Sequence, residues 1–358
     1  MRSWLLVLLV LMSIHSPLAS QQGQGESVKI TAEERGEAIS AVAKAFDSHY
    51  VFPEVAVKVK ATLEAEKNKG RYANIRTGPE LARVLSVHLQ EITKDRHIRV
   101  NYSSKKLPGP RPDMLPDPDT GLSVEEKYER MLEMTRIDNA GYVKVERLPG
   151  NIGYIRQDGF VHPHANREPL EAAMAFVKNT DALILDLRYN IGGPSWTVRD
   201  VCSCFFADDK PVLLSTIKAT RMGLTEEFWT DKEVPGPRYL DKPVFVLTSA
   251  YTSSGAEECA YNFQAQKRAT IVGKTTADGP NPTSNVPAAD HYLISIPTGQ
   301  VINPVTKTNW IGVGVKPDLA VDADKALDTA CDLAVKVLLD SKDEKVRAGK
   351  GRHRRCAA

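Results

Sequence analysis

From about residue 141 onward, the chain alternates short β-rich runs with helical segments, and this alternation constrains the fold more than any other feature. The runs ALILDL (182–187) and VFVLTS (244–249) are continuously apolar, as strands covered on both faces of a sheet require. The alternation predicts a layered α/β domain, which we place at residues 122–340. The expected strands are 143–148, 151–157, 182–188, 211–217, 243–250, 269–273 and 291–297, and the expected helices are 167–179, 197–207, 254–266 and 323–340.

The chain before this domain has a helical pattern. Residues 31–93 place apolar residues three and four apart in three stretches, and the same periodicity returns at 123–137, at the start of the α/β domain. Thr31 and Glu34 can form a capping box, and Pro53 and Pro79 suit first helical turns. We therefore expect a small helical N-terminal domain at 28–102, which ends in a short strand-like segment. A linker with five prolines follows at 103–121.

The first 20 residues have the layout of a secretory signal peptide. Arg2 precedes an apolar run from Trp4 to Ile14, and residues 17–20 offer small residues for cleavage. The apolar run is shorter than the roughly 20 residues that a membrane-spanning helix needs. We therefore expect an exported protein, periplasmic or extracellular, that starts near Gln21 and has no stable membrane insertion. An N-terminal anchor that is not cleaved is the alternative.

Charge and cysteine usage exclude several classes of protein. The net charge of +2 argues against a nucleic-acid-binding surface over the whole chain. A basic tail at 341–358 lacks apolar periodicity, which is typical of a solvated end, and a weak contact with an anionic surface is the alternative. The chain has no CxxC pair, so we expect neither a zinc site nor a dense disulfide framework. The chain has five cysteines, Cys202, Cys204, Cys259, Cys331 and, in the tail, Cys356. We expect most of them to be small core residues.

The sharpest candidate site is VFVLTSAYTSSGAEECAYNF, where an expected strand ends near Thr248 and a helix begins at Ser254. A serine in that place has its hydroxyl beside free backbone N–H groups at the positive end of a helix dipole. Such N–H groups can stabilise the oxyanion of a tetrahedral intermediate. Ser254 and Glu257 also match a capping box, and a plain helix cap is the simpler interpretation of these residues alone.

A second strand-to-helix turn contains Asn190, Ile191, Gly192 and Gly193. Paired glycines let a backbone approach a ligand closely and point N–H groups at it, and taken alone they indicate a turn that needs positive φ. Because both turns follow buried strands, they can lie side by side at the strand ends, where α/β sheets usually place their sites.

A serine becomes a strong nucleophile when a base takes its proton, and histidine is the usual base. His97 stands at a helix-to-strand junction near Asp95, in the segment LQEITKDRHIRV. The remaining histidines fall in helical periods, an HPH loop, a strand start and the tail, and a metal role for the HPH pair is a weak alternative. These residues are His49 and His88, His162 and His164, His291, and His353.

The chain contains, in order, YVFPE, KDRH, ILDLRYNIGG, LTSAYTSSGAEE, VGKTTADGPNP and NWIGVGVKPDL. This series resembles the tail-specific protease (C-terminal processing) family of serine peptidases, and in particular the branch with the tricorn core and the interphotoreceptor retinoid-binding protein modules. The resemblance covers about residues 30–340. It implies a crotonase/ClpP-like ββα-spiral domain, preceded by a helical domain. Residues 101–140 are too short and too rich in proline for the PDZ domain that processing members often insert.

The resemblance implies a role for several residues of this chain. Ser254 falls on the family nucleophile, and Gly255 carries the N–H next to it. Gly192 and Gly193 fall on the second oxyanion element, and His97 falls on the base of the tricorn-like branch.

The chain also departs from the family pattern. Processing members use a lysine base about 25 residues beyond the serine; here that position is Gly279, and Lys274 stands five positions too early. The branch usually has a glutamate where this chain has Ile311, so the acid that would orient the histidine is replaced by an apolar residue. Glu257 and Asp278 are the candidate acids that could compensate.

These observations predict a secreted serine-type peptidase that acts on a peptide or protein substrate and needs no metal or organic cofactor. Its activity is weakened by Ile311 unless another group orients His97. The alternative is an inactive relative that binds a peptide or an apolar, lipid-like ligand, because the change to Ile311 removes a charge from the cleft. A purely structural domain is a third interpretation.

Overall fold

The computed structural model describes residues 28–107 and 123–340, which form two compact units. Residues 28–107, 219–223 and 281–299 make up the first unit, and the other described residues make up the second. Within these ranges, no helix combines the length and the apolarity that crossing a membrane requires. The expected signal peptide at 1–20, most of the linker at 103–121 and the basic tail at 341–358 lie outside the described residues.

Three helices and an antiparallel sheet build the first unit. Strand β10 pairs with β1 on one side and β9 on the other, and Val100 stands opposite Ile294 in the register. The helices and the sheet enclose one core, in which Phe46, Leu85 and Ile294 are fully buried. The elements are α1 Ala32–His49, α2 Pro53–Asn68, α3 Gly78–Thr93, β1 Arg99–Tyr102, η2 Thr220–Met222, β9 Thr283–Ala289 and β10 Tyr292–Pro297.

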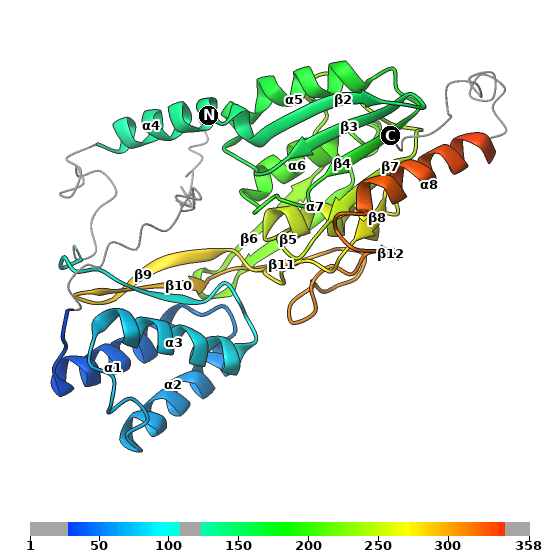
Figure 1. Ribbon diagram of the computed structural model, residues 1–358. Helices are drawn as coiled ribbons and strands as arrows, with labels where there is room; N and C mark the ends of the chain where they lie inside the picture. The colour runs from blue at the N-terminus through cyan, green and yellow to red at the C-terminus, as the bar shows by residue number, and fades with distance from the viewer. Residues whose placement is uncertain (1–27, 108–122, 341–358) are drawn as a thin grey trace. The chain divides into compact units, whose positions relative to one another are not determined.

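The second unit is built around a six-stranded sheet with the order β12-β8-β7-β4-β3-β2. Its neighbouring strands run parallel, except that β2 pairs antiparallel with β3. The labels β2, β3, β4, β7 and β8 follow one another across this sheet in Figure 1. A smaller sheet has the order β11-β5-β6. The strands are β2 Tyr142–Leu148, β3 Ile152–Gln157, β4 Ala182–Asp186, β5 Leu213–Ala219, β6 Leu224–Trp229, β7 Val244–Thr248, β8 Thr270–Gly273, β11 Gln300–Ile302 and β12 Leu319–Ala320.

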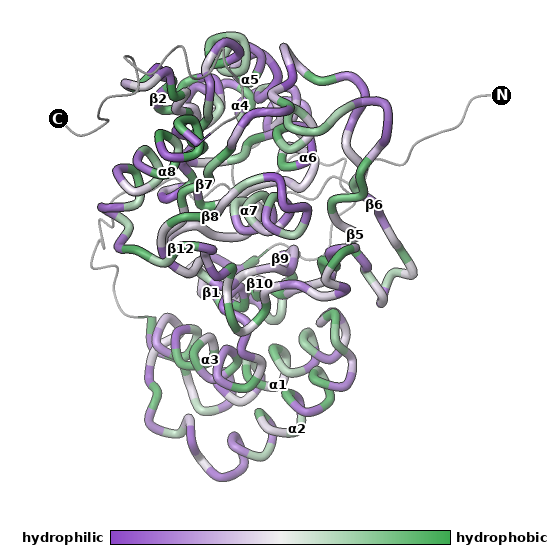
Figure 2. The backbone as a smooth tube through the Cα atoms, turned by 90° about the vertical axis from the view of Figure 1, so that its right-hand side faces the viewer, coloured by the Kyte–Doolittle hydropathy of each residue, from purple (hydrophilic) through white to green (hydrophobic). Residues whose placement is uncertain are grey.

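Helices cover both faces of the six-stranded sheet. Successive residues of a strand point to opposite faces, so Leu183 and Leu185 of β4 join a core with α5, α6 and α7. Ala182 and Ile184 join a second core with α8. Strand β7 is buried along its whole length, and Figure 2 shows it as a hydrophobic stretch. The helices are α4 Val124–Ile137, η1 Asn139–Gly141, α5 Pro163–Val177, α6 Ser195–Ser203, α7 Gly255–Ala265 and α8 Ala326–Asp340.

The structure confirms the α/β fold with a helical N-terminal region, together with the expected helices and strands. The capping box of Thr31 and Glu34 forms, and Pro53 and Pro79 lie in first helical turns. Strands β6, β9, β11 and β12 were not predicted. Residues 281–299, which the sequence analysis grouped with 122–340, belong to the first unit because β10 pairs with β1 and adds its apolar side chains to that core.

Two smaller expectations have different outcomes. The HPH residues lie only partly in a loop: His162 ends the loop as the N-cap of α5, whereas His164 lies in the first turn of that helix. The expected role of the cysteines as small core residues is confirmed for Cys202, Cys204, Cys259 and Cys331, which are buried, while Cys356 lies outside the described residues.

Candidate active site

Ser254 connects β7 to α7 with a positive φ, at φ 53° and ψ −123°. The N–H of Ser254 donates to Glu257, but the Ser254 hydroxyl makes no capping hydrogen bond, so only half of the expected capping box forms. Two other helices of the chain begin with the full box, at Thr31 and Ser123, and both of those caps have ordinary extended backbones with φ of −74° and −65°. Capping therefore does not require the strained backbone of Ser254. Strain of this kind clusters at active sites, and it is characteristic of a nucleophilic serine at a strand-to-helix turn.

The glycine turn after β4 packs directly against the Ser254 turn. Gly192 and Gly193 have φ of 96° and 146°, a backbone that favours glycine. A Cβ atom added at Gly192 would lie 2.7 Å from the Cβ of Ser254, and one added at Gly255 would lie 2.5 Å from the carbonyl oxygen of Gly193. The expectation that the two turns lie side by side is therefore confirmed.

Asn190 ties these turns together, a role that the sequence analysis did not assign. Its side chain is fully buried, its Oδ1 accepts the N–H of Gly192 at 2.8 Å, and its Nδ2 donates to the carbonyl of Gln157 at 2.9 Å. Its own carbonyl accepts the N–H of Ser253 at 3.1 Å. The Asn-x-Gly pattern was the available signal, because asparagine often bonds to the backbone two residues on.

The N–H groups of the two turns differ in availability. The N–H of Gly192 is occupied by Asn190. In the part of the chain that the structure describes, the N–H groups of Gly193 and Gly255 have no acceptor. The Gly255 N–H is one of the donors that the first turn of any helix leaves unpaired. The geometry thus offers two main-chain donors beside Ser254 that could bind an oxyanion.

Glu257 anchors a loop to the Ser254 turn. The residue is fully buried, and its carboxylate accepts four hydrogen bonds. One oxygen accepts the N–H of Ser254 at 2.8 Å and that of Gly279 at 2.9 Å. The other accepts the N–H of Asp278 at 2.8 Å and the hydroxyl of Thr276. All four partners are donors, so this carboxylate is engaged in holding the backbone.

Asp278 connects the same loop to the segment that contains Ile311. Asp278 has φ 70°, and its Oδ1 accepts the N–H of Gly312 at 2.7 Å. Ile311 is half-buried, and its N–H donates to Oδ1 of Asn309 at 3.0 Å. A carboxylate from another loop, that of Asp278, therefore lies next to position 311.

A second buried acid, Glu258, joins the helices behind the two turns. Its carboxyl accepts the hydroxyls of Ser195, at the start of α6, and Ser215, in β5, each at 2.7 Å. Burial raises the pKa of the Glu258 carboxyl, and the two serine hydrogen bonds oppose this increase. The sequence analysis did not single out Glu258, because a helical glutamate next to a capping residue carries no signal of burial.

His97 lies in the first unit, between α3 and β1, and is half-buried. Its ring Nδ1–H donates to the carbonyl of Asn281 at 2.8 Å, and its main-chain N–H donates to Oδ1 of Asp95 at 2.9 Å. Asp95 is only 1% exposed. Burial raises the pKa of Asp95, while the nearby His97 and Asn281 side chains oppose the increase.

Other polar candidates have structural surroundings. Lys274 is exposed and forms an ion pair with Asp322 at 3.0 Å. The rings of His162 and His164 stack with their centroids 5.3 Å apart, and burial lowers the pKa of His162. Across residues 28–107 and 123–340, no three His, Cys, Asp or Glu side chains come together as a set of metal ligands.

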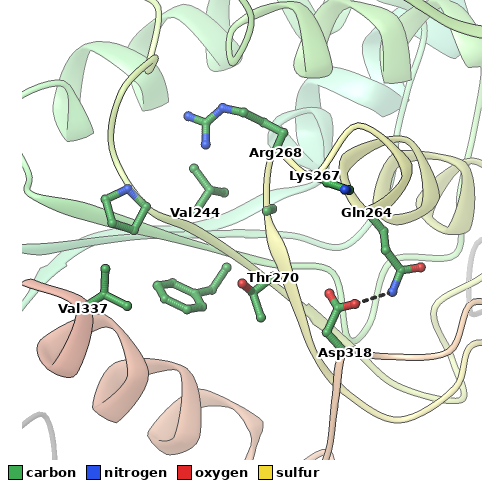
Figure 3. A pocket seen from close by; sticks show the side chains of 10 residues that line it. Val244, Gln264, Lys267, Arg268, Thr270, Asp318 and Val337 are labelled. Carbon is green, nitrogen blue, oxygen red and sulfur yellow. Dashed lines mark hydrogen bonds between the residues drawn. The ribbon is translucent and has the colours of Figure 1, made fainter. Parts of the chain in front are cut away.

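A pocket of about 400 Å³ lies away from the two turns. It is lined by Val244 and Thr270, which begin β7 and β8, and by Gln264, whose amide donates to Asp318 at 2.8 Å (Figure 3). Ser254 follows the other end of β7. The pocket lies at the amino end of β7 and Ser254 follows its carboxyl end, so this pocket is separate from the candidate active site.

The parallel sheet, the strained serine and the facing glycine turn together have the layout of a serine hydrolase. Comparison with known proteins agrees: the model of peptidase family S41 matches residues 151–321. The model of the N-terminal domain of peptidase S41 in eukaryotic IRBP matches residues 27–134. The chain therefore carries a peptidase family S41 domain, preceded by the N-terminal domain of that family.

Named relatives include two processing proteases. The carboxy-terminal-processing protease of Bartonella bacilliformis is 28% identical over 182 residues, which cover 49% of this chain and 40% of that protein. The carboxyl-terminal-processing protease of Synechocystis is 29% identical over 160 residues, which cover 44% and 35% of the two chains. The chain thus spans well under half the length of either relative.

Among solved structures, a candidate peptidase from Parabacteroides merdae aligns with a TM-score of 0.57 and 18% identity, over 88% of this chain and 99% of that one. At this level of identity, the likeness shows the fold alone.

Proposed function

We propose that the chain is a serine-type peptidase in which Ser254 attacks the carbonyl carbon of a peptide bond. The observation that carries this proposal is the strained backbone of Ser254 packed against the Gly193 turn. Strained backbone conformations cluster at functional sites, where the surrounding structure holds them in place. The capping boxes at Thr31 and Ser123 show that capping alone needs no strain.

The oxyanion would be held by the N–H groups of Gly255 and Gly193. Both donors lack an acceptor within the described residues and flank the serine. Gly192 would not be an oxyanion donor, because its N–H already donates to Asn190. Its lack of a side chain would leave room for Ser254, which any Cβ at this position would contact too closely. Glu257 would act as a positioning residue rather than as the acid that orients the base, since four donors occupy its carboxylate.

His97 would be the base. It would take the proton of the Ser254 hydroxyl at Nε2 as the Oγ–C bond forms, and would give that proton to the leaving amine as the peptide C–N bond breaks. Water would then attack the acyl-enzyme, passing its proton to His97, and Ser254 would regain a proton as the carboxylic product leaves. The assignment of His97 rests on its place in the order of motifs, since it belongs to the first unit and Ser254 to the second.

A peptide or protein substrate is supported by the two relatives, both of which are named as C-terminal processing proteases. We also propose that the protein is exported to a periplasmic or extracellular space through residues 1–20. N-terminal sequencing of protein recovered from the exported fraction tests this point, with a start near residue 21 as the expected result and an intact residue 1 as the contrary one.

A second candidate function is the binding of a peptide or an apolar, lipid-like ligand without hydrolysis. Ile311 stands where the branch has an acid, and the side chains of Ile191 and Tyr251, which flank the two turns, are 52% and 74% exposed. Apolar side chains on those turns suit either an apolar segment of a peptide or a lipid-like molecule.

Hydrolysis of a fluorogenic peptide library decides between the two functions. We expect measurable turnover by the wild type and background turnover by Ser254→Ala. Ser253→Ala is the matched control, because Ser253 is the adjacent serine and its hydroxyl donates to the carbonyl of Ile191 at 2.9 Å. Turnover that survives in Ser254→Ala would contradict the assignment, and background turnover by a folded wild type would favour the binding function.

A further inference from the structure

The ring of His97 is oriented by a main-chain carbonyl. Its Nδ1 lies 2.8 Å from the carbonyl oxygen of Asn281, within the first unit. A carbonyl oxygen can only accept a hydrogen bond, so Nδ1 must carry the proton. In the neutral ring, this leaves Nε2 with a free lone pair. That tautomer is the one a general base requires when Nε2 takes the proton of a serine.

Asp95 holds the main chain of His97 in place. Its Oδ1 accepts the main-chain N–H of His97 at 2.9 Å, and its own N–H donates to the hydroxyl of Thr93 at 3.2 Å. The side chain of Asn281 lies close enough to the Asp95 carboxylate to oppose the effect of burial on its pKa. Asp95 itself is 1% exposed, so its carboxylate is a fixed point that holds the main chain of His97.

We propose that in this peptidase the carbonyl of Asn281 takes the orienting role that an acid has in related enzymes, and that Asp95 is the positioning residue for His97. The inference rests on the proposed function, and it accounts for Ile311. Losing the triad acid costs about four orders of magnitude in turnover chiefly because the histidine then adopts the wrong tautomer. A carbonyl bonded to Nδ1 prevents that loss without a carboxylate at position 311.

The position of Asn281 in the chain suits this role. It follows the loop of residues 276–280 directly, and Gly279 of that loop is bonded to Glu257, which also accepts the N–H of Ser254. One short segment therefore carries both the carbonyl bonded to the base and an N–H bonded to the carboxylate that holds the nucleophile's backbone.

The tautomer of His97 can be measured directly. Full-length protein labelled with ¹⁵N-histidine is recorded by long-range ¹H–¹⁵N correlation at a pH of about 8, above the ordinary histidine pKa of about 6.5. His97→Gln assigns the His97 signal. His49 serves as an internal reference, because its Nδ1–H also donates to a carbonyl, that of Ala45 at 2.9 Å. We expect His97 to show a protonated Nδ1 and a bare Nε2, and a proton on Nε2 would overturn the inference.

Asp95 variants test the positioning role. We expect Asp95→Ala to lower kcat at least about tenfold with KM little changed, and to give His97 a mixture of tautomers. Asp95→Asn should restore most of the rate, because an amide oxygen can still accept the His97 N–H. The His291 ring, whose Nδ1–H donates to Ser103 at 2.9 Å, reports that the first unit remains folded. An unchanged His97 tautomer in a folded Asp95→Ala variant would refute the role of Asp95.

The two proposals fail in different ways. If the wild type neither hydrolyses peptides nor reacts with a serine-directed probe, the proposed function fails whatever the tautomer. If hydrolysis is present and is lost in His97→Gln but not in His49→Gln, while His97 carries its proton on Nε2, only the inference about Asn281 fails.

Discussion

Replacing Glu257 by glutamine should destabilise the second unit strongly, although the side chain keeps its size. The carboxylate accepts from Ser254, Thr276, Asp278 and Gly279. A glutamine has one acceptor oxygen, and its NH₂ group must face two of these donors. In the better orientation, the Thr276 hydroxyl can turn to accept from the NH₂, but the N–H of Asp278 is left without a partner.

The size of the effect follows from this count. The orphaned buried N–H costs about 1–3 kcal/mol, and losing the charge weakens the other three hydrogen bonds by about 1 kcal/mol each. A neutral amide is cheaper to bury than a carboxylate, which offsets part of the sum. We therefore expect a net loss of about 2–4 kcal/mol, which corresponds to a decrease in Tm of roughly 4–16 °C for a unit of this size.

Glu258→Gln is the matched control, since Glu258 is the next residue of the same helix and is also buried. Its partners are the hydroxyls of Ser195 and Ser215, which can rotate to accept as well as donate. We expect its unfolding free energy to change by less than about 1 kcal/mol. Tryptophan fluorescence follows the relevant unit, because the tryptophans of the described residues, Trp196, Trp229 and Trp310, lie in it. Equal destabilisation by the two variants would refute the reasoning about donors and acceptors.

Three further outcomes are expected. In urea unfolding, Ser254→Gly should be more stable than Ser254→Ala by about 1–3 kcal/mol, since glycine relieves the strain at φ 53°, and equal stabilities would show that no strain is stored there. Burial raises the pKa of Glu258 above its unfolded value of about 4.3, so the folded protein binds that proton more tightly. The stability of the wild type relative to Glu258→Gln should therefore fall as the pH rises from about 4 toward neutrality, and a flat difference would contradict this account. Ile311→Glu should leave kcat/KM within about threefold of the wild type if Asn281 orients His97, whereas a gain of tenfold or more would show that an acid is the missing part.

The fold could be predicted where the local pattern and the burial agree. Local sequence patterns predict the helices α1, α2 and α3, from their helical periodicity, and the strands β4 and β7, from their apolar runs. They do not predict strand β9, because its sequence TSNVPAA contains a proline and lacks apolar alternation. It becomes a strand by pairing with β10, and β10 joins β1 from about 190 residues earlier in the chain. Such pairing has no local signal.

Part of the candidate site could likewise be predicted from the sequence, and part could not. The approach of Ser254 to Gly192 and Gly193 follows from two buried parallel strands with turns at the same ends, so the sequence contained it. The bonds that organise the site were not predictable, because most of them involve the main chain. Glu257 accepts three backbone N–H groups, and His97 donates to a backbone carbonyl. Any residue type supplies such groups, so no sequence pattern marks them.

The central claim is that Ser254 is an activated nucleophile, and reaction with a fluorophosphonate probe tests it most directly. Intact mass and peptide mapping of the full-length protein should show a single adduct, located on Ser254. That adduct should be absent in Ser254→Ala and His97→Gln and retained in Ser253→Ala and His49→Gln. A folded wild type that takes up no probe, or an adduct that persists in Ser254→Ala, would contradict the account.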